Sequence, residues 1–330
     1  MATSTSNVSW ADCQITTETF KQVGPHPIKV DIVLPPGLKE GKHPLIIAYH
    51  GGYLIAGARN FYFMMASWLP SYAASTNAIL ISPDHRLLPS ASVAEILSDL
   101  EDLWLWVHSS LPSIIASHTP LSKHSIDLNH ILLEGNSAGG FNAAHLALTH
   151  HAQIRAAILV YPMVDCLMDH FTIGPPESQL SEDEDRTLWK GDVLDRKIEQ
   201  ARTAGCVTTR VDAEGRLLTR SMAKRGKLGT FFKSDPRTNP LTRVLDPLET
   251  DGLPTKVVSG RWILQGKDDT GVPPEGSIAF EKAVLQNSWS TELILDVIHD
   301  EPSEHGFDRT WTMADEKLTK RLDWINQAWL

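Results

Sequence analysis

The chain has 330 residues, of which 42% are hydrophobic, so it can bury a sizeable core, and a wholly disordered protein is excluded. Its formal net charge is −10 and no concentrated basic stripe offsets it, which argues against a nucleic acid as partner. No apolar run approaches the ~20 residues that cross a bilayer, so no membrane span is expected.

The cysteines and the N-terminus indicate the compartment. Cys13, Cys166 and Cys206 are widely spaced and odd in number, which predicts neither a disulfide framework nor a metal-binding knuckle. Residues 1–7 are polar and lack the basic and apolar regions of a secretory signal. We therefore expect a protein of the reducing cytoplasm.

Two segments of strand character open the chain, at residues 14–20 and 28–34. Continuous apolar runs, typical of strands buried on both faces of a parallel sheet, follow at residues 44–49, 78–82, 131–133, 156–161, 262–264 and 293–297. Helical patterns occur at residues 61–75, 93–108, 141–151, 277–285 and 312–330. This alternation predicts an α/β fold with a mostly parallel, doubly wound sheet, in which ligands bind beyond the carboxyl ends of the strands.

One long interval, residues 166–258, contains no strong buried run but has charged segments and helical stretches near residues 186–203. A structureless loop of this length does not fit a compact domain. We therefore expect an inserted, mainly helical cap at residues 166–258, between two parts of an α/β core at residues 28–165 and 259–330. The N-terminal arm, residues 1–27, is a candidate part of the cap.

The central motif is the pentapeptide Gly135-Asn136-Ser137-Ala138-Gly139, which follows an apolar run and precedes a helical pattern. Strand, tight turn and helix in this order form a nucleophile elbow, whose strained turn requires small residues on both sides of the serine. The N-terminus of the new helix points its free N–H groups at the reacting centre. The pattern predicts Ser137 as a nucleophile.

A second glycine-rich turn follows the apolar run at residues 44–49. Gly51 and Gly52 come directly after His50, and paired glycines allow backbone N–H groups to turn toward a developing oxyanion. We expect the N–H groups of Gly51, Gly52 and Ala138 to form an oxyanion hole. The alternative is a turn that needs glycine for its geometry alone.

Two carboxylates compete for the role of the acid that orients a catalytic histidine, Asp268 and Asp269. In the recurring pattern G-x-x-D-x-x-V-P the acid stands three residues past the glycine, here Gly266, which selects Asp269. The more ordinary role of an aspartate in such a loop is to stabilise the turn, and we assign that role to Asp268.

Two histidines follow the last predicted strand, His299 and His305. His305 precedes Gly306 and Phe307 at the start of a predicted helix, where a loop can carry the imidazole to the serine. His299 stands almost at the strand end, which favours a structural role. The order Ser…Asp…His, with each residue after its own strand, selects His305 as the general base.

These motifs resemble the α/β-hydrolase fold and, within it, the hormone-sensitive-lipase-like carboxylesterases, from about residue 28 to the C-terminus. The resemblance rests on residues 50–52, 84–89 and 135–140, on the Asp269 loop and on residues 305–307. It implies an eight-stranded sheet, a helical cap, no metal or other cofactor, and hydrolysis of esters of modest size through an acyl-enzyme.

The chain departs from the family pattern beside the nucleophile. Tyr53 replaces the third glycine of the H-G-G-G motif, and Asn136 replaces the usual aspartate, which removes a charge. We expect both to contact the substrate. Residues 61–65, with Phe61 first among them, are further candidates for a pocket wall, and their alternative role is the inner face of a helix. Arg86 is expected to hold its own loop in place.

Three hypotheses follow. The first is a serine hydrolase that cleaves a carboxylic ester, lactone or thioester of a small to medium organic molecule. The second keeps the catalytic triad but transfers the acyl group to an alcohol or amine, or releases a biosynthetic intermediate as a thioesterase or cyclase. The third is a binding protein on a hydrolase scaffold. Plant gibberellin receptors resemble this family but lack the catalytic histidine, whereas this chain retains His305.

Overall fold

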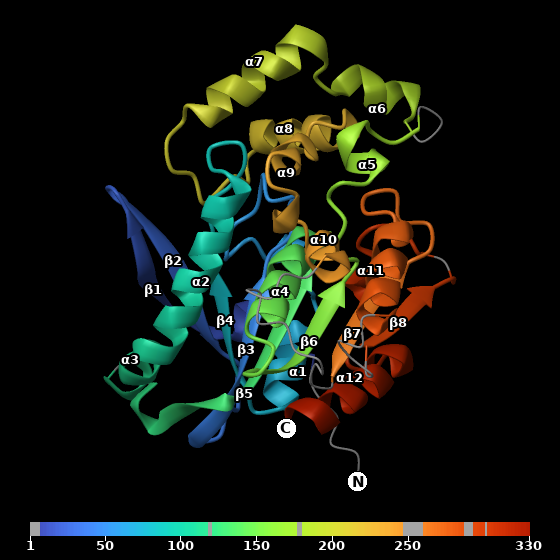
Figure 1. Cartoon of the computed structure of the whole chain (residues 1–330). Coiled ribbons are helices and arrows are strands. Elements are labelled where there is room, and N and C mark those ends of the chain that lie inside the picture. Colours follow the sequence, from blue (N-terminus) through green and yellow to red (C-terminus); the bar gives the residue numbers. More distant parts are fainter. Residues whose placement is uncertain (1–6, 118–120, 177–179, 247–259, 287–292, 301) are drawn as a thin grey trace.

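The computed structural model describes residues 7–117, 121–176, 180–246, 260–286, 293–300 and 302–330. Its centre is an eight-stranded sheet with the strand order β1-β2-β4-β3-β5-β6-β7-β8 (Figure 1). In chain order the strands are β1 (Gln14–Val23), β2 (His26–Leu34), β3 (Gly41–Tyr49), β4 (Ile79–Pro83), β5 (His124–Asn136), β6 (Ile154–Val160), β7 (Arg261–Gly266) and β8 (Leu293–Ile298). The pairs β1–β2 and β2–β4 are antiparallel and the other pairs are parallel, which confirms the predicted sheet.

Helices pack on both faces of the sheet because its central strands are apolar on both sides. The helices that contribute to the hydrophobic cluster of the first face are α2 (Val93–Ser109), α3 (Leu111–Ser117), α4 (Ala138–Thr149), α10 (Pro240–Leu245) and α11 (Pro274–Gln286). The second face is covered by α1 (Leu69–Ser75) and α12 (Glu316–Trp329). The two clusters together form the core that holds the strand ends in register.

Between β6 and β7, the residues that the structure describes form helices and no strand of the sheet. These helices are α5 (Asp169–Thr172), α6 (Glu182–Thr187), α7 (Gly191–Arg202), α8 (Ala213–Lys224), α9 (Thr230–Lys233) and α10 (Pro240–Leu245). Figure 1 shows α5 to α9, which we call the helical layer, above the carboxyl ends of the strands. A third buried cluster, which includes Phe171, Leu218 and Met222, packs the layer against Phe141 of α4.

The N-terminal residues differ from the expected arm over the cap. Residues 14–23 form β1, which lies at one end of the sheet and pairs with β2. Before β1, the Trp10 ring stacks on Tyr62 with centroids 4.5 Å apart, and Trp10 belongs to the core cluster of the second sheet face. The apolar ring therefore anchors the start of the chain beside α1, and the core begins before residue 28.

One helical prediction was too long. The pattern at residues 61–75 becomes an α-helix only at Leu69, because Pro70 occupies its first turn, where a missing N–H costs no hydrogen bond. The helical stretches expected near residues 186–203 are the end of α6 and the whole of α7, and Leu188 between them is extended and buried.

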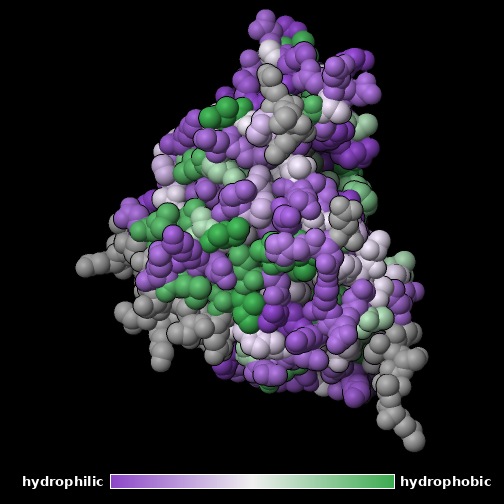
Figure 2. All heavy atoms as spheres, turned by 90° about the vertical axis from the view of Figure 1, so that its right-hand side faces the viewer, coloured by the Kyte–Doolittle hydropathy of each residue, from purple (hydrophilic) through white to green (hydrophobic). Residues whose placement is uncertain are grey.

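The face that contains α11 and β8 is partly hydrophobic (Figure 2). Ile278 and Leu285 of α11 are exposed, and most side chains of β8 are half-buried. β8 is the last strand in the sheet order, so one of its edges has no partner strand among the described residues. No helix in the described part of the chain has the length and apolar composition needed to cross a bilayer.

Candidate active site

Ser137 occupies a sharp turn between β5 and α4. Its backbone has φ 56° and ψ −117°, a conformation that L-residues rarely adopt. A Cβ atom on Gly135 would lie 2.2 Å from the carbonyl oxygen of Gly139, and a Cβ atom on Gly139 would lie 2.0 Å from the carbonyl oxygen of Tyr49. Only glycine therefore fits at these two positions. The Ser137 N–H donates to the carbonyl of Val160 at 2.8 Å, which fixes the turn to β6. This is the geometry of a nucleophile elbow.

His305 and Asp269 are brought together after β8 and β7. The His305 Nδ1–H donates to the Asp269 Oδ2 at 2.8 Å, and this carboxylate also accepts the N–H groups of Gly271 and Val272. The carboxylate is buried and the ring is 22% exposed. Since the proton lies on Nδ1, the His305 Nε2 is a free acceptor, as a general base requires.

The competing residues lie elsewhere. Asp268 accepts a hydrogen bond from the Ser303 hydroxyl instead of contacting an imidazole. His299 is exposed and borders a separate hollow formed by β8 and α12, together with Asp296 and Lys317. Neither of the two residues lines the cavity that contains Ser137.

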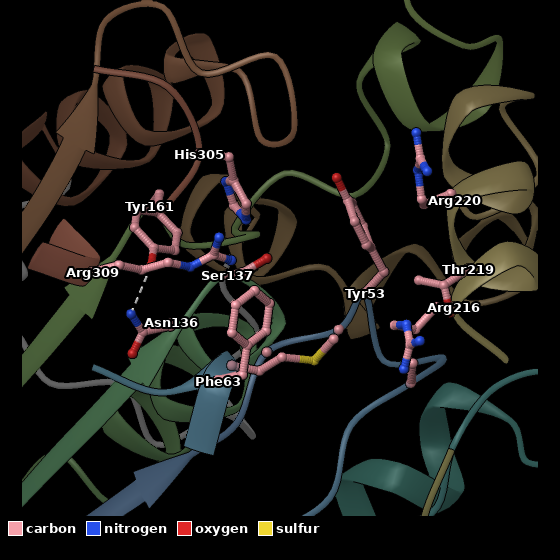
Figure 3. A pocket seen from close by; sticks show the side chains of 14 residues that line it. Tyr53, Phe63, Asn136, Ser137, Tyr161, Arg216, Thr219, Arg220, His305 and Arg309 are labelled. Atoms are coloured by element: carbon pink, nitrogen blue, oxygen red, sulfur yellow. Dashed lines mark hydrogen bonds between the residues drawn. The ribbon is translucent and has the colours of Figure 1, made fainter. Parts of the chain in front are cut away.

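A cavity of about 210 Å³ opens above Ser137 (Figure 3). Its described lining consists of Gly51, Gly52, Tyr53, Ala56, Phe63, Met64, Asn136, Ser137, Tyr161, Arg216, Thr219, Arg220, His305 and Arg309. The figure shows the His305 ring pointing toward the Ser137 side chain. No hydrogen bond joins these two described side chains, a common feature of catalytic pairs without bound substrate.

The expected oxyanion hole needs one correction, at Gly51. The Gly51 N–H donates to the carbonyl of Met64 at 3.0 Å, so it is not available to a ligand. Within the described residues no acceptor takes the N–H groups of Gly52, Tyr53 or Ala138. The sequence could not show this, because the bond depends on how the loop after β3 folds back on its own 3₁₀ turn, η2 (Tyr62–Met64).

The three candidate substrate contacts have different positions. Tyr53 and Asn136 line the cavity, and the Tyr53 hydroxyl donates to the carbonyl of Gly271 at 2.9 Å, which ties the oxyanion loop to the Asp269 loop. Phe61 does not line it. Of the expected wall at residues 61–65, Phe63 and Met64 of the short turn η2 line the cavity, so the expectation was wrong for Phe61.

A buried polar network below the cavity was not anticipated. The Asn136 amide donates to the Tyr161 hydroxyl, which donates to the Asp308 carboxyl, both at 2.9 Å. The Trp68 indole donates to the other Asp308 oxygen at 3.2 Å, and burial raises the pKa of Asp308. The Tyr161 ring packs against the His305 ring with centroids 4.4 Å apart, so the network holds in place the ring that His305 contacts.

Replacing Tyr161 by phenylalanine is expected to lower the free energy of unfolding by about 1–3 kcal/mol, because the buried Asn136 amide and Asp308 carboxyl each lose a partner. Urea denaturation of both proteins measures the difference. Tyr62→Phe is the matched control, since the Tyr62 hydroxyl has no hydrogen bond to a described residue. An equal loss in both variants would contradict the role of the network.

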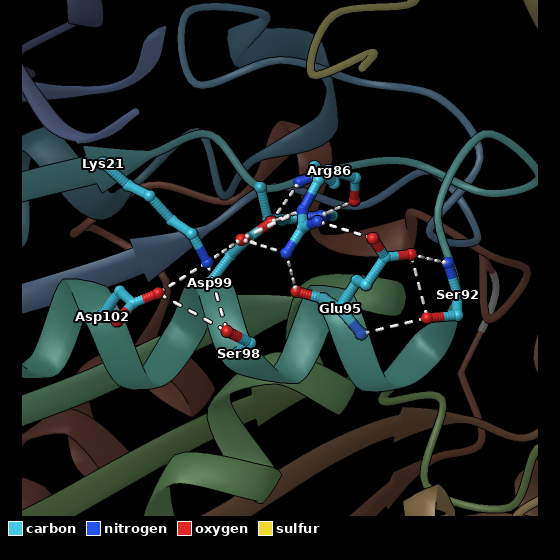
Figure 4. A network of polar contacts seen from close by, with 8 residues as sticks. Lys21, Arg86, Ser92, Glu95, Ser98, Asp99 and Asp102 are labelled. Atoms are coloured by element: carbon cyan, nitrogen blue, oxygen red, sulfur yellow. Dashed lines mark hydrogen bonds and ion pairs between the residues drawn. The ribbon is translucent and has the colours of Figure 1, made fainter. Parts of the chain in front are cut away.

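The segment at residues 84–89 holds the loops around the site together. The Arg86 guanidinium contacts the carboxylates of Asp99 and Glu95 on α2 (Figure 4). The His85 ring stacks on His50 with centroids 4.8 Å apart, and burial lowers the pKa of His85 to about 3, so this ring is neutral. The segment is structural, and Arg86 does not line the cavity.

No group of three or more His, Cys, Asp or Glu side chains in the described part of the chain is arranged to hold a metal ion. The polar groups at the cavity are instead a hydroxyl, an imidazole backed by a carboxylate, and free backbone N–H groups. This set of groups suits attack on a carbonyl carbon and stabilisation of the resulting oxyanion.

Residues 46–204 match the family model of the alpha/beta hydrolase fold. A probable carboxylesterase, M8, from a Phoma species is 28% identical over 317 residues, which cover 94% of each chain. A probable carboxylesterase, clz11, from Cochliobolus lunatus is 38% identical over 102 residues, 31% of this chain and 46% of that one. An esterase from Pyrobaculum calidifontis has a similar structure, with a TM-score of 0.58 and 16% identity over 96% of this chain and 86% of that one.

The family match contains the nucleophile turn, and the similarity to M8 extends over the segments that carry Asp269 and His305 as well. The structural similarity to the Pyrobaculum calidifontis esterase covers 96% of this chain, so it extends over both parts of the α/β core. The chain therefore has the α/β-hydrolase fold and is similar to a probable carboxylesterase over 94% of its length.

Proposed function

We propose that the protein hydrolyses a carboxylic ester of small to medium size through an acyl-enzyme on Ser137. The observation that carries the proposal is the hydrogen bond between His305 and Asp269, which leaves the His305 Nε2 facing the cavity of Ser137. A base oriented in this way can take the serine proton as the oxygen attacks.

The reaction proceeds in two halves. In the first, the Ser137 Oγ bonds to the ester carbonyl carbon, its proton moves to the His305 Nε2, and that proton then leaves with the alcohol. In the second, His305 takes a proton from water as the water oxygen bonds to the acyl carbon. The bond from that carbon to the Ser137 Oγ then breaks, and His305 returns the proton to the Oγ as the acid is released. Asp269 holds the imidazole in the required tautomer throughout.

The negative charge that develops on the carbonyl oxygen needs donors. We propose the N–H groups of Gly52 and Tyr53, which line the cavity of Ser137, and of Ala138, which directly follows Ser137; all three are free of other acceptors among the described residues. Ala138 supports this role further because it is the first residue of α4, where a helix has unsatisfied N–H groups and a partial positive charge.

Labelling with a fluorophosphonate, followed by peptide mass spectrometry, tests the proposal. We expect stoichiometric labelling of Ser137 and turnover of p-nitrophenyl acetate or butyrate to the free acid. An unlabelled serine with no turnover of a broader ester panel would overturn it and favour a binding protein. Formation of a new ester or amide from an added alcohol or amine, with little free acid, would favour acyl transfer.

A further inference from the structure

The cavity above Ser137 is lined by positively charged side chains, whereas the chain as a whole carries a negative charge. Its lining includes three arginines, Arg216, Arg220 and Arg309, and among the described residues no Asp or Glu lines it. The rest of the wall is mainly apolar. The whole chain has a formal charge of −10, so the positive cavity is a local feature that opposes the overall charge.

Arg309 lies on the nucleophile's side of the cavity. It follows His305 in the same loop and belongs to the 3₁₀ turn η7 (Phe307–Thr310). Its guanidinium lies over the Phe63 ring, 4.3 Å from the centroid, and has no carboxylate partner among the described residues. Stacking on an aromatic ring fixes the plane of a guanidinium while its N–H donors stay available at the edge.

Arg216 and Arg220 enter from α8 on the other side of the cavity. Figure 3 shows them beyond Tyr53, across the cavity from Arg309. The Arg216 guanidinium donates to the backbone carbonyl of Val211, which leaves its charge uncompensated by a described carboxylate. Arg220 contacts Glu184 at 3.0 Å in an exposed pair, which contributes little stability and can exchange its partner.

We infer that the natural substrate is an ester that also carries a carboxylate, bound by these arginines while its carbonyl lies at Ser137; this rests on the proposed function. A carboxylate matches the two parallel N–H donors of a guanidinium, and such charge-assisted pairs are stronger than neutral hydrogen bonds. The apolar wall of Phe63, Met64 and Ala56 receives the hydrocarbon part. The substrate is therefore amphiphilic and anionic.

Two matched pairs of esters test the inference and locate the anion. Hydrogen 4-nitrophenyl adipate against 4-nitrophenyl hexanoate places the charge on the acyl side, at equal chain length. 4-Carboxyphenyl butyrate against 4-carbamoylphenyl butyrate places it on the alcohol side, with a neutral group of equal shape. We expect kcat/KM for the anionic ester to exceed that for its neutral partner by about tenfold or more in one of the pairs. We expect this preference to shrink as salt is added.

The variants Arg309→Gln and Arg216→Gln/Arg220→Gln are expected to lower that ratio by about tenfold, because each removes a charge-assisted hydrogen bond to the carboxylate. Arg202→Gln is the matched control: it is an exposed arginine of α7 that pairs with Glu199 and does not line the cavity. The ratio in this control is expected to equal that of the unchanged protein.

If kcat/KM for the neutral ester equals or exceeds that for the anionic ester in both pairs, the inference is overturned, while the esterase proposal stays intact. An unchanged preference in the triple variant of Arg216, Arg220 and Arg309 would do the same. If no ester is turned over, the proposed function fails, and calorimetric titration with adipate still tests the arginines. Binding that is lost in the triple variant would support the anion site, and no binding by the unchanged protein would overturn it.

Discussion

Replacing Ser137 by alanine is expected to reduce kcat for ester hydrolysis by about 10⁴-fold or more, because alanine has no oxygen to form the acyl-enzyme. The residual rate comes from the oxyanion donors and from substrate binding, which the substitution leaves in place. Steady-state hydrolysis of p-nitrophenyl butyrate measures the loss, and labelling by a fluorophosphonate should disappear with it.

The control for this variant is a measurement of its thermal stability, which shows whether the protein still folds. The turn has a left-handed φ of 56° at Ser137, and alanine is strained there to a similar degree as serine, so the thermal midpoint should change little. Ser109→Ala, at an exposed position at the end of α2, should keep full activity. A Ser137→Ala protein that remains folded and hydrolyses esters at the original rate would contradict the proposed mechanism.

The variant Asp269→Asn is expected to lower kcat by about 10³- to 10⁴-fold, because an amide presents its own N–H to the His305 Nδ1 and so stabilises the other tautomer. In that tautomer the Nε2 carries a proton and cannot accept the one from Ser137. The measurement is kcat at neutral pH with a neutral ester. KM should change less than kcat, because Asp269 does not line the cavity.

Asp268→Asn is the matched control, one residue away in the same loop. Its carboxylate accepts a hydrogen bond from Ser303 and contacts no imidazole in the described part of the chain, so activity should stay close to that of the unchanged protein. A larger loss from Asp268→Asn than from Asp269→Asn would reverse the assignment of the acid.

Much of the architecture could be read from short stretches of the chain. Each buried strand is a continuous apolar run, and the Ser137 turn is recognised from five consecutive residues with glycine at the positions that exclude a Cβ. The ends of the helices were harder to predict from the sequence. At α1, for example, the α-helix begins only at Leu69, with Pro70 in its first turn, although the helical pattern starts at residue 61.

The site was harder to predict where it depends on tertiary contacts. The Gly51 N–H donates to the Met64 carbonyl, and Phe63 lines the cavity while Phe61 does not. Both outcomes follow from the path of one loop. The network of Tyr161 and Asp308 joins residues 147 positions apart, and no local pattern marks either of them. Such contacts arise from the packing of the sheet, which no window of the sequence contains.

By itself, the sequence determined the order of strands and helices, the strained turn at Ser137 and the order of serine, aspartate and histidine, because these depend on local residue size and on periodicity. Only the tertiary structure decided which N–H groups stay free and which charges surround the cavity. Arg216 and Arg309 are 93 positions apart, and they meet at one cavity because α8 lies above the strand ends from which the histidine loop emerges. The sum of charges along a chain carries no information on where they meet, and here a protein with a charge of −10 lines its cavity with arginine.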